Sequence, residues 1–205
     1  MKKLFLGAMA LLAAVTLVAC GSKKDAYESI KENKKLVVAV SPDYAPFEFK
    51  TLVDGKDQVV GSDIKLAQAI ADELGVKLEV TTMSFDNVLS SLQAGKADIA
   101  ISGISVTDER KKQVDFALPY MKVSIGVVSP KDKVIKDVKE LEGKTLIVTK
   151  GTTAETYFEK NYPNIKLQKY DQYSDAYQAL LDGRGDAFST DNTEVPVSYT
   201  HLRAH

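Results

Sequence analysis

Short apolar runs alternate with amphipathic segments along most of the chain. Leu36–Val40 is a continuous apolar run, which is typical of a buried parallel strand. In residues 62–75 the apolar positions recur at helical spacing, which predicts a helix with Asp63 as its N-cap and Gly75 directly after its end. The same patterns predict strands at 76–82, 98–102, 123–129, 145–149, 165–170 and 186–190, and helices at 87–95, 138–141, 152–162 and 174–181. This alternation indicates an α/β protein with mostly parallel sheets flanked by helices.

One stretch of the sequence occurs twice. SLQAGKADIAIS at 91–102 aligns with ALLDGRGDAFST at 179–190. The alignment pairs Leu92 with Leu180, Gly95 with Gly183, Lys96 with Arg184, Asp98 with Asp186 and Ser102 with Thr190. Each copy reads as a helix end, a glycine cap, a basic residue and a strand, which favours two similar lobes. The alternative is that helix–glycine–strand corners converge on such sequences in any α/β protein.

The N-terminus reads as a targeting segment. Lys2 and Lys3 precede an uncharged apolar run at 4–19, which has the length of a signal-peptide core. Small residues then lead to Cys20, and the segment resembles a bacterial lipoprotein lipobox. We therefore expect 1–19 to be a signal peptide, Cys20 to be lipidated, and 20–35 to form a polar tether. The alternative is an ordinary secretory signal with an incidental cysteine.

Composition narrows the function classes. The chain has 205 residues, with 27 Lys and Arg against 28 Asp and Glu. Its charges balance, so it lacks the excess of positive charge that is typical of nucleic-acid-binding proteins. It has one Cys, and its two His are His201 and His205. The body of the chain therefore lacks a histidine base, a histidine metal ligand and a Cys–His pair. We expect no cofactor, no metal and no catalytic residue.

The residues at the strand ends suggest a ligand. Ligands of open parallel sheets bind at the carboxyl ends of the strands. There, Arg110 offers a fork for a carboxylate and Asp191 offers an anion for an ammonium group. Tyr44 and Phe85 offer apolar walls, and hydroxyl groups come from Ser102, Ser105, Thr152 and Thr153. Opposite charges on two walls match a zwitterion, so the expected ligand is an α-amino acid. Taken singly, each of these residues also reads as a solvated charge, a turn residue or a core aromatic.

Four segments resemble one protein family. They are SPDYAPFEF at 41–49, residues 84–120 with the stretch ISGISVTDERKK, LEGKTLIVTKGTTAETY at 141–157, and DGRGDAFSTD at 182–191. They resemble the solute-binding proteins of bacterial polar amino acid ABC transporters. The resemblance implies a two-lobed α/β fold of the type II periplasmic-binding-protein kind. Lobe I would span 36–121, and 122–195 would hold a hinge strand and part of lobe II. PVSYTHLRAH at the end matches nothing in the family, so we expect 196–205 to be a non-native tail and the C-terminal part of the fold to be missing.

The resemblance also implies roles for the site residues. Tyr44 and Phe85 would sandwich the ligand side chain, and Asp191 would bind the α-ammonium near the Gly103 carbonyl. The expected carboxylate clamp is Arg110 with Ser105 and Thr153. Ser102 and Thr152 complete the expected site. Ser41 stands where members that bind cationic amino acids carry an acid, which disfavours a purely cationic ligand, although Asp43 could substitute.

The implied partners are an ABC permease and its ATPase, with the monomeric protein held outside the cell membrane by its lipid. The main alternative is an enzyme on the same scaffold, a cyclohexadienyl or arogenate dehydratase, with Glu155 or Asp43 as its acid or base. A further alternative is an amino-acid sensor or adhesin.

Overall fold

The computed structural model describes residues 25–193. The predicted signal peptide, Cys20 and the predicted tail at 196–205 therefore lie outside the described residues. The described part begins with helix α2, Ala26–Asn33, whose first turn is capped by the Asp25 carboxylate through the amide N–H of Tyr27. This helix lies at the end of the expected tether.

The first lobe is built on a parallel sheet of three strands. In sheet order these are β5 (Lys77–Thr82), β1 (Lys35–Val40) and β6 (Ile99–Ala100). Helices α3 (Ser62–Leu74) and α4 (Phe85–Gln93) pack against it. The apolar run predicted as a buried strand forms the centre of this core, and Leu36, Val38 and Val40 are at most 1% exposed.

The start of helix α3 differs from the prediction. Its N-cap is Gly61, and Asp63 lies within the first turn at only 1% exposure. The Asp63 carboxylate accepts hydrogen bonds from Gly103 N–H at 3.2 Å and from the Tyr120 hydroxyl at 2.8 Å. Asp63 was predicted to cap the helix because it is acidic and precedes the apolar periodicity, but its side chain instead joins the helix to distant segments. Gly75 ends α3 in the left-handed conformation, with φ of 64°.

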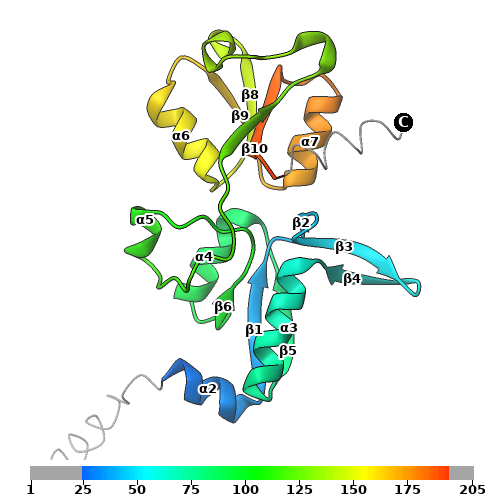
Figure 1. The fold of residues 1–205 in the computed structure, drawn as a ribbon, viewed down its shortest axis with the longest axis vertical. Coiled ribbons are helices and arrows are strands. Elements are labelled where there is room, and N and C mark those ends of the chain that lie inside the picture. Colours follow the sequence, from blue (N-terminus) through cyan, green and yellow to red (C-terminus); the bar gives the residue numbers. More distant parts are fainter. Residues whose placement is uncertain (1–24, 194–205) are drawn as a thin grey trace, which may run out of the picture.

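An antiparallel sheet that the sequence patterns did not predict projects from the first lobe (Figure 1). Its order is β2 (Asp43–Tyr44), β3 (Glu48–Val53) and β4 (Lys56–Val60). Glu48, at the start of β3, pairs with Tyr44 in this sheet and is fully buried. The hairpin therefore brings an acid to Ser102, whose hydroxyl donates to Glu48 and accepts from the Ser41 N–H directly after β1.

The second lobe is a mixed sheet of four strands. Their order is β7 (Ile125–Val128), β10 (Ala187–Asp191), β8 (Thr145–Thr149) and β9 (Lys166–Tyr170). Strand β7 runs antiparallel to β10, and the other pairs are parallel. The flanking helices are α6 (Thr153–Asn161) and α7 (Tyr173–Leu181), and the short helices η1 (Lys131–Lys133) and η2 (Val138–Leu141) connect β7 to β8. Together with the hairpin, β7 makes the sheets less uniformly parallel than predicted.

The sequence repeat corresponds to the same corner in each lobe. Gly95 and Gly183 have φ of 65° and 69° after α4 and α7. The Asp98 carboxylate accepts a hydrogen bond from Val37 N–H at 2.8 Å, and the Asp186 carboxylate accepts one from Thr145 N–H at 2.8 Å. Both aspartates therefore fasten the corner to an inner strand of their own sheet, β1 in the first lobe and β8 in the second.

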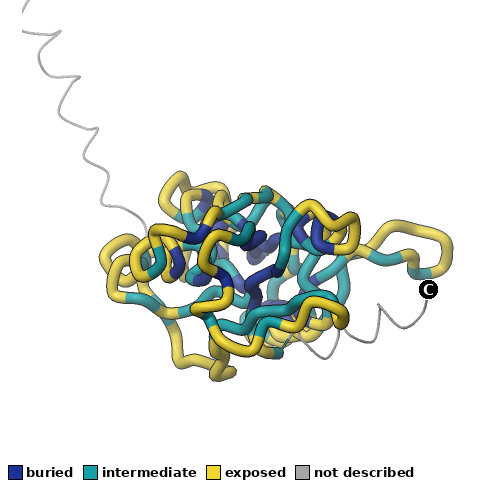
Figure 2. The backbone as a smooth tube through the Cα atoms, turned by 90° about the horizontal axis from the view of Figure 1, so that it is seen from above, coloured by how far each residue is buried: buried dark blue, intermediate teal, exposed yellow. Residues whose placement is uncertain are grey.

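The two lobes lie one above the other in Figure 1, joined by a segment that follows the short helix α5 (Asp108–Lys111). Residues 112–124 form no helix or strand, and the predicted lobe boundary at 121–122 falls among them. Where the chain passes between the lobes, the Asn192 N–H donates to the Ser124 carbonyl at 2.9 Å, and the Ser124 N–H donates to the side-chain Oδ1 of Asn192 at 2.9 Å. Figure 2 shows the buried backbone gathered inside the molecule, with exposed loops around it.

Candidate amino-acid site between the lobes

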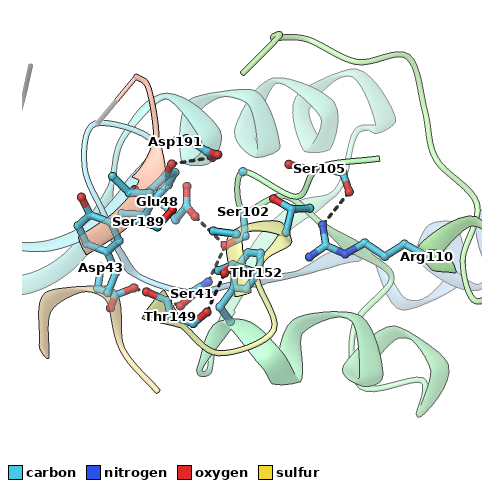
Figure 3. Close-up of a pocket in the computed structure, with 17 residues that line it drawn as sticks. Ser41, Asp43, Glu48, Ser102, Ser105, Arg110, Thr149, Thr152, Ser189 and Asp191 are labelled. Atoms are coloured by element: carbon cyan, nitrogen blue, oxygen red, sulfur yellow. Dashed lines mark hydrogen bonds between the residues drawn. The ribbon is translucent and has the colours of Figure 1, made fainter. Parts of the chain in front are cut away.

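A cavity of about 60 Å³ lies between the lobes (Figure 3). Strand ends of the first lobe, the start of α6 and the end of β10 line it. All nine residues predicted for the site border this cavity: Tyr44, Phe85, Ser102, Gly103, Ser105, Arg110, Thr152, Thr153 and Asp191. Arg110 enters from one side of the view, and Asp43 and Asp191 lie on the other.

Arg110 spans the two lobes. Its Nη1 donates to the Ser105 carbonyl at 2.7 Å, and its Nη2 donates to the Gly151 carbonyl of the second lobe at 2.8 Å. The guanidinium carbon lies 5.7 Å from the centre of the Phe85 ring, within cation–π range. Burial lowers the pKa of Arg110 and the Asp191 charge opposes this, but a guanidinium stays protonated in proteins. A fixed, half-buried cation thus faces the cavity.

Asp191 ends β10 and supplies the opposite charge. Its Oδ2 accepts a hydrogen bond from the Tyr44 hydroxyl at 2.9 Å. Burial raises the pKa of Asp191, while the Tyr44 hydrogen bond and the Arg110 charge act in the other direction. Asp191 is therefore poorly solvated. The positive charge of a ligand's ammonium group would compensate for the solvation by water that the carboxylate has lost.

Aromatic rings form the walls. The Tyr44 ring stacks on Phe47 at 5.4 Å and meets the edge of Tyr173 at 5.2 Å. Gly103 allows this close approach, because a Cβ at that position would lie 3.1 Å from the Tyr44 ring. Phe85 is the first residue of α4. The two predicted sandwich residues thus reach the cavity from different elements of the first lobe.

Two of the predicted hydroxyl groups are already engaged. The Ser102 hydroxyl donates to Glu48 Oε1 at 2.6 Å and accepts from Ser41 N–H at 2.9 Å. The Thr152 hydroxyl donates to the Thr149 carbonyl at 2.7 Å and accepts from Glu155 N–H at 3.2 Å, which caps α6. In this arrangement neither hydroxyl proton is available to a ligand. Both residues shape the cavity through the neighbours that they hold.

Several residues that line the cavity were not among the predicted site residues. Ser41 was considered only as a modifier of specificity, and Asp43 as a modifier of specificity or as the acid or base of the enzyme alternative. The rest were missed: Glu48, Thr149, Ala154, Tyr173, Ser189 and Thr190. Ser189 could have been found, because it stands two residues before Asp191 on a strand and so shares its face. Of the two candidates for the acid or base of the enzyme alternative, Asp43 lines the cavity and Glu155 does not; the Glu155 carboxylate accepts from Gly151 N–H and pairs with Lys169.

Two structural features are absent from residues 25–193. Within this range, no group of three or more His, Cys, Asp and Glu side chains is arranged to hold a metal ion. In the same range, every helix is too short or too polar to cross a membrane.

Comparisons with known proteins identify the family. The model of the bacterial extracellular solute-binding proteins, family 3, matches residues 36–195. The arginine-binding extracellular protein ArtP of Bacillus subtilis is 38% identical over 91% of this chain and 72% of its own length. A cyclohexadienyl dehydratase of Pseudomonas aeruginosa matches at 32% identity over 93% of this chain and 70% of its own.

Solved structures show the same fold. The structure of an amino acid ABC transporter substrate-binding protein from Streptococcus pneumoniae, bound to L-arginine, is 49% identical over 89% of this chain and 75% of its own, with a TM-score of 0.82. The predicted two-lobed α/β fold is therefore confirmed. These two binding proteins match at higher identity than the dehydratase. The chain belongs to the bacterial extracellular solute-binding proteins, family 3, and is an amino-acid-binding, extracytoplasmic protein rather than an enzyme.

Proposed function

We propose that this protein captures a polar L-amino acid between its two lobes and delivers it to the membrane permease of an ABC importer. The observation that carries the proposal is one interlobe cavity that presents both a guanidinium and a carboxylate, on Arg110 and Asp191. A zwitterion presents the complementary pair of charges. Burial makes both interactions stronger than they would be in water.

The residues take the following roles. Arg110 binds the α-carboxylate through a bidentate fork, with Ser105 and Thr153 adding donors beside it. Asp191 binds the α-ammonium together with the Gly103 carbonyl. Tyr44 and Phe85 enclose the side chain, while Ser102 and Thr152 hold the surrounding backbone.

Closure couples binding to a change of shape. Tyr44, Phe85, Ser105 and Arg110 come from the first lobe, whereas Thr153 and Asp191 come from the second. An amino acid touches both sets only when the lobes are together, so it stabilises the closed form. The closed complex is the species that the permease receives, and a cytoplasmic ATPase drives release and transport.

Anchoring keeps the protein near the permease. We propose that Cys20 is lipidated after removal of residues 1–19, leaving a monomer tethered outside the membrane. Metabolic labelling with a fatty-acid analogue tests this, since Cys20→Ser should abolish label incorporation. Label retained on Cys20→Ser would place the lipid elsewhere.

The binding function is tested by a thermal-shift screen of the twenty amino acids, followed by calorimetry. A ligand that binds only the folded state raises the melting temperature. Arginine belongs in the first set, because similar binding proteins carry that name. The absence of any shift or heat with all twenty would overturn the proposal.

Arg110→Ala tests the clamp. We expect it to weaken binding by about 3–5 kcal/mol, since a desolvated carboxylate loses its partner. Arg184→Ala is the matched control, because Arg184 is exposed and pairs with Asp182 away from the cavity. Equal affinities for the two variants would remove Arg110 from the carboxylate role.

A further inference from the structure

Helix α7 begins at the cleft without a side-chain cap of its own. Its N-cap residue is Gln172, whose side chain makes no capping hydrogen bond. By contrast, α6 in the same lobe is capped by Thr152. The first amide groups of a helix have no partner inside it, so the start of α7 needs an acceptor from elsewhere or from water.

That acceptor comes from the opposite lobe. Asp43 of β2, in the first lobe, accepts a hydrogen bond through Oδ2 from the amide N–H of Ser174 at 3.3 Å. Ser174 is the second residue of α7, and its amide is one of the groups that an N-cap side chain normally satisfies. A carboxylate beside a helix N-terminus is also favoured by the helix dipole.

The Asp43 side chain is held in this orientation. The Ser41 hydroxyl donates to its other oxygen, Oδ1, at 3.1 Å. The next residue, Tyr44, contacts Tyr173 at the first position of α7, and Tyr173 packs in turn on Phe188 in the core of the second lobe. The capping contact therefore links β2, where Ser41 fixes the Asp43 carboxylate, to the start of α7, which packs on the core of the second lobe.

We propose that Asp43 is a positioning residue for lobe closure: its carboxylate caps α7 across the cleft when the lobes are together, and so strengthens amino-acid binding without contacting the amino acid. When the lobes separate, the start of α7 faces water and the contact is lost. This proposal rests on the proposed function, because closure around the ligand is what the contact stabilises.

The proposal predicts different effects for two substitutions. Asp43→Ala removes the cap and should raise Kd about 3- to 10-fold, by the same factor for every amino acid that binds. Most of the change should lie in the dissociation rate, because the contact exists in the closed form. Asp43→Asn keeps an acceptor for Ser174 and should stay within about twofold of the unmodified protein.

A second variant separates capping from ligand contact. Gln172→Ser gives α7 a cap within its own lobe, so adding Asp43→Ala to it should have less effect than Asp43→Ala alone. Asp57→Ala is the control, since Asp57 is an exposed acid on β4, in the same antiparallel sheet but away from the cavity. Its affinities should be unchanged.

A ligand-free measurement separates this proposal from the binding function. Spin labels are placed on Lys56→Cys in the first lobe and Lys160→Cys in the second, in mature protein with Cys20→Ser. Asp43→Ala should shift the label distances toward longer values, and Asp43→Asn should not.

If no amino acid binds the unmodified protein, the proposed function fails, yet these distances still test the cap. Unchanged distances in Asp43→Ala would overturn the proposal, as would an Asp43→Asn defect confined to cationic amino acids, which would make Asp43 a ligand contact.

Discussion

Glu48 is a fully buried acid at the cavity. Burial raises its pKa to about 10; the Ser102 hydrogen bond opposes the rise, and the nearby charges of Asp63 and Asp43 add to it. Glu48 Oε2 meets no donor in the described part of the chain, while the Asp63 carboxyl lies within hydrogen-bonding reach of Glu48. Two carboxyl groups can bond to each other only when one carries a proton. Burial therefore favours the neutral, protonated form of Glu48 at pH 7, which has a proton to offer to Asp63.

Glu48→Gln tests this protonation state. The folded pKa lies above the unfolded value of 4.5, so the folded state binds more protons and stability falls as pH rises from about 4.5 toward 10. The slope from one such group approaches about 1.4 kcal/mol per pH unit. Glutamine keeps the neutral shape and lacks the proton, so the variant should lose that slope in urea unfolding between pH 5 and pH 9. Glu142→Gln, at an exposed position, should keep it, and an unchanged slope in Glu48→Gln would mean that Glu48 is ionised.

At the scale of the elements, parallel strands explain why the site could be predicted. The carboxyl ends of β1, β6, β8 and β10 point to one cleft, so residues directly after or at those ends meet there. The hairpin β3–β4 was missed because its strands carry many exposed polar residues, although Asp54–Gly55 at its turn is a strong hairpin signal. Tyr173 had no such signal, since only the docking of α7 brings it to the cavity.

Gly151, in the loop between β8 and α6, sets how closely those elements approach the first lobe. A Cβ there would lie 2.8 Å from Asp86 Cα in α4, closer than real contacts allow. Gly151→Ala should therefore hold the lobes apart and weaken binding by about 1–3 kcal/mol for every amino acid, as measured by calorimetry.

Gly183→Ala is the matched control for this change. Gly183 has a similar φ of 69°, against 76° for Gly151, but nothing lies within 4 Å of its added Cβ. It should lose stability through backbone strain while its folded form keeps its affinity. Equal affinities for Gly151→Ala and Gly183→Ala would mean that closure does not require this approach.

At the scale of the whole molecule, the two lobes have separate cores. The buried clusters of the first lobe include Leu36 and Val88, and those of the second include Leu146 and Phe188. Each described cluster stays within its own lobe, whereas polar contacts such as those of Arg110 cross the cleft. Whether the two lobes unfold together therefore depends on the contacts across the cleft and on a ligand bound in it.

Calorimetric unfolding can measure that dependence. Without ligand we expect two overlapping transitions, because each lobe buries its own apolar surface. Phe188→Ala should remove about 3–5 kcal/mol from the second lobe and lower one transition, whereas Leu36→Ala, at about 2–5 kcal/mol, should lower the other. A saturating amino acid bridges both lobes, so it should draw the transitions of the unmodified protein together. A single ligand-free transition shifted equally by both variants would instead show that the contacts across the cleft alone make the lobes fold as one unit.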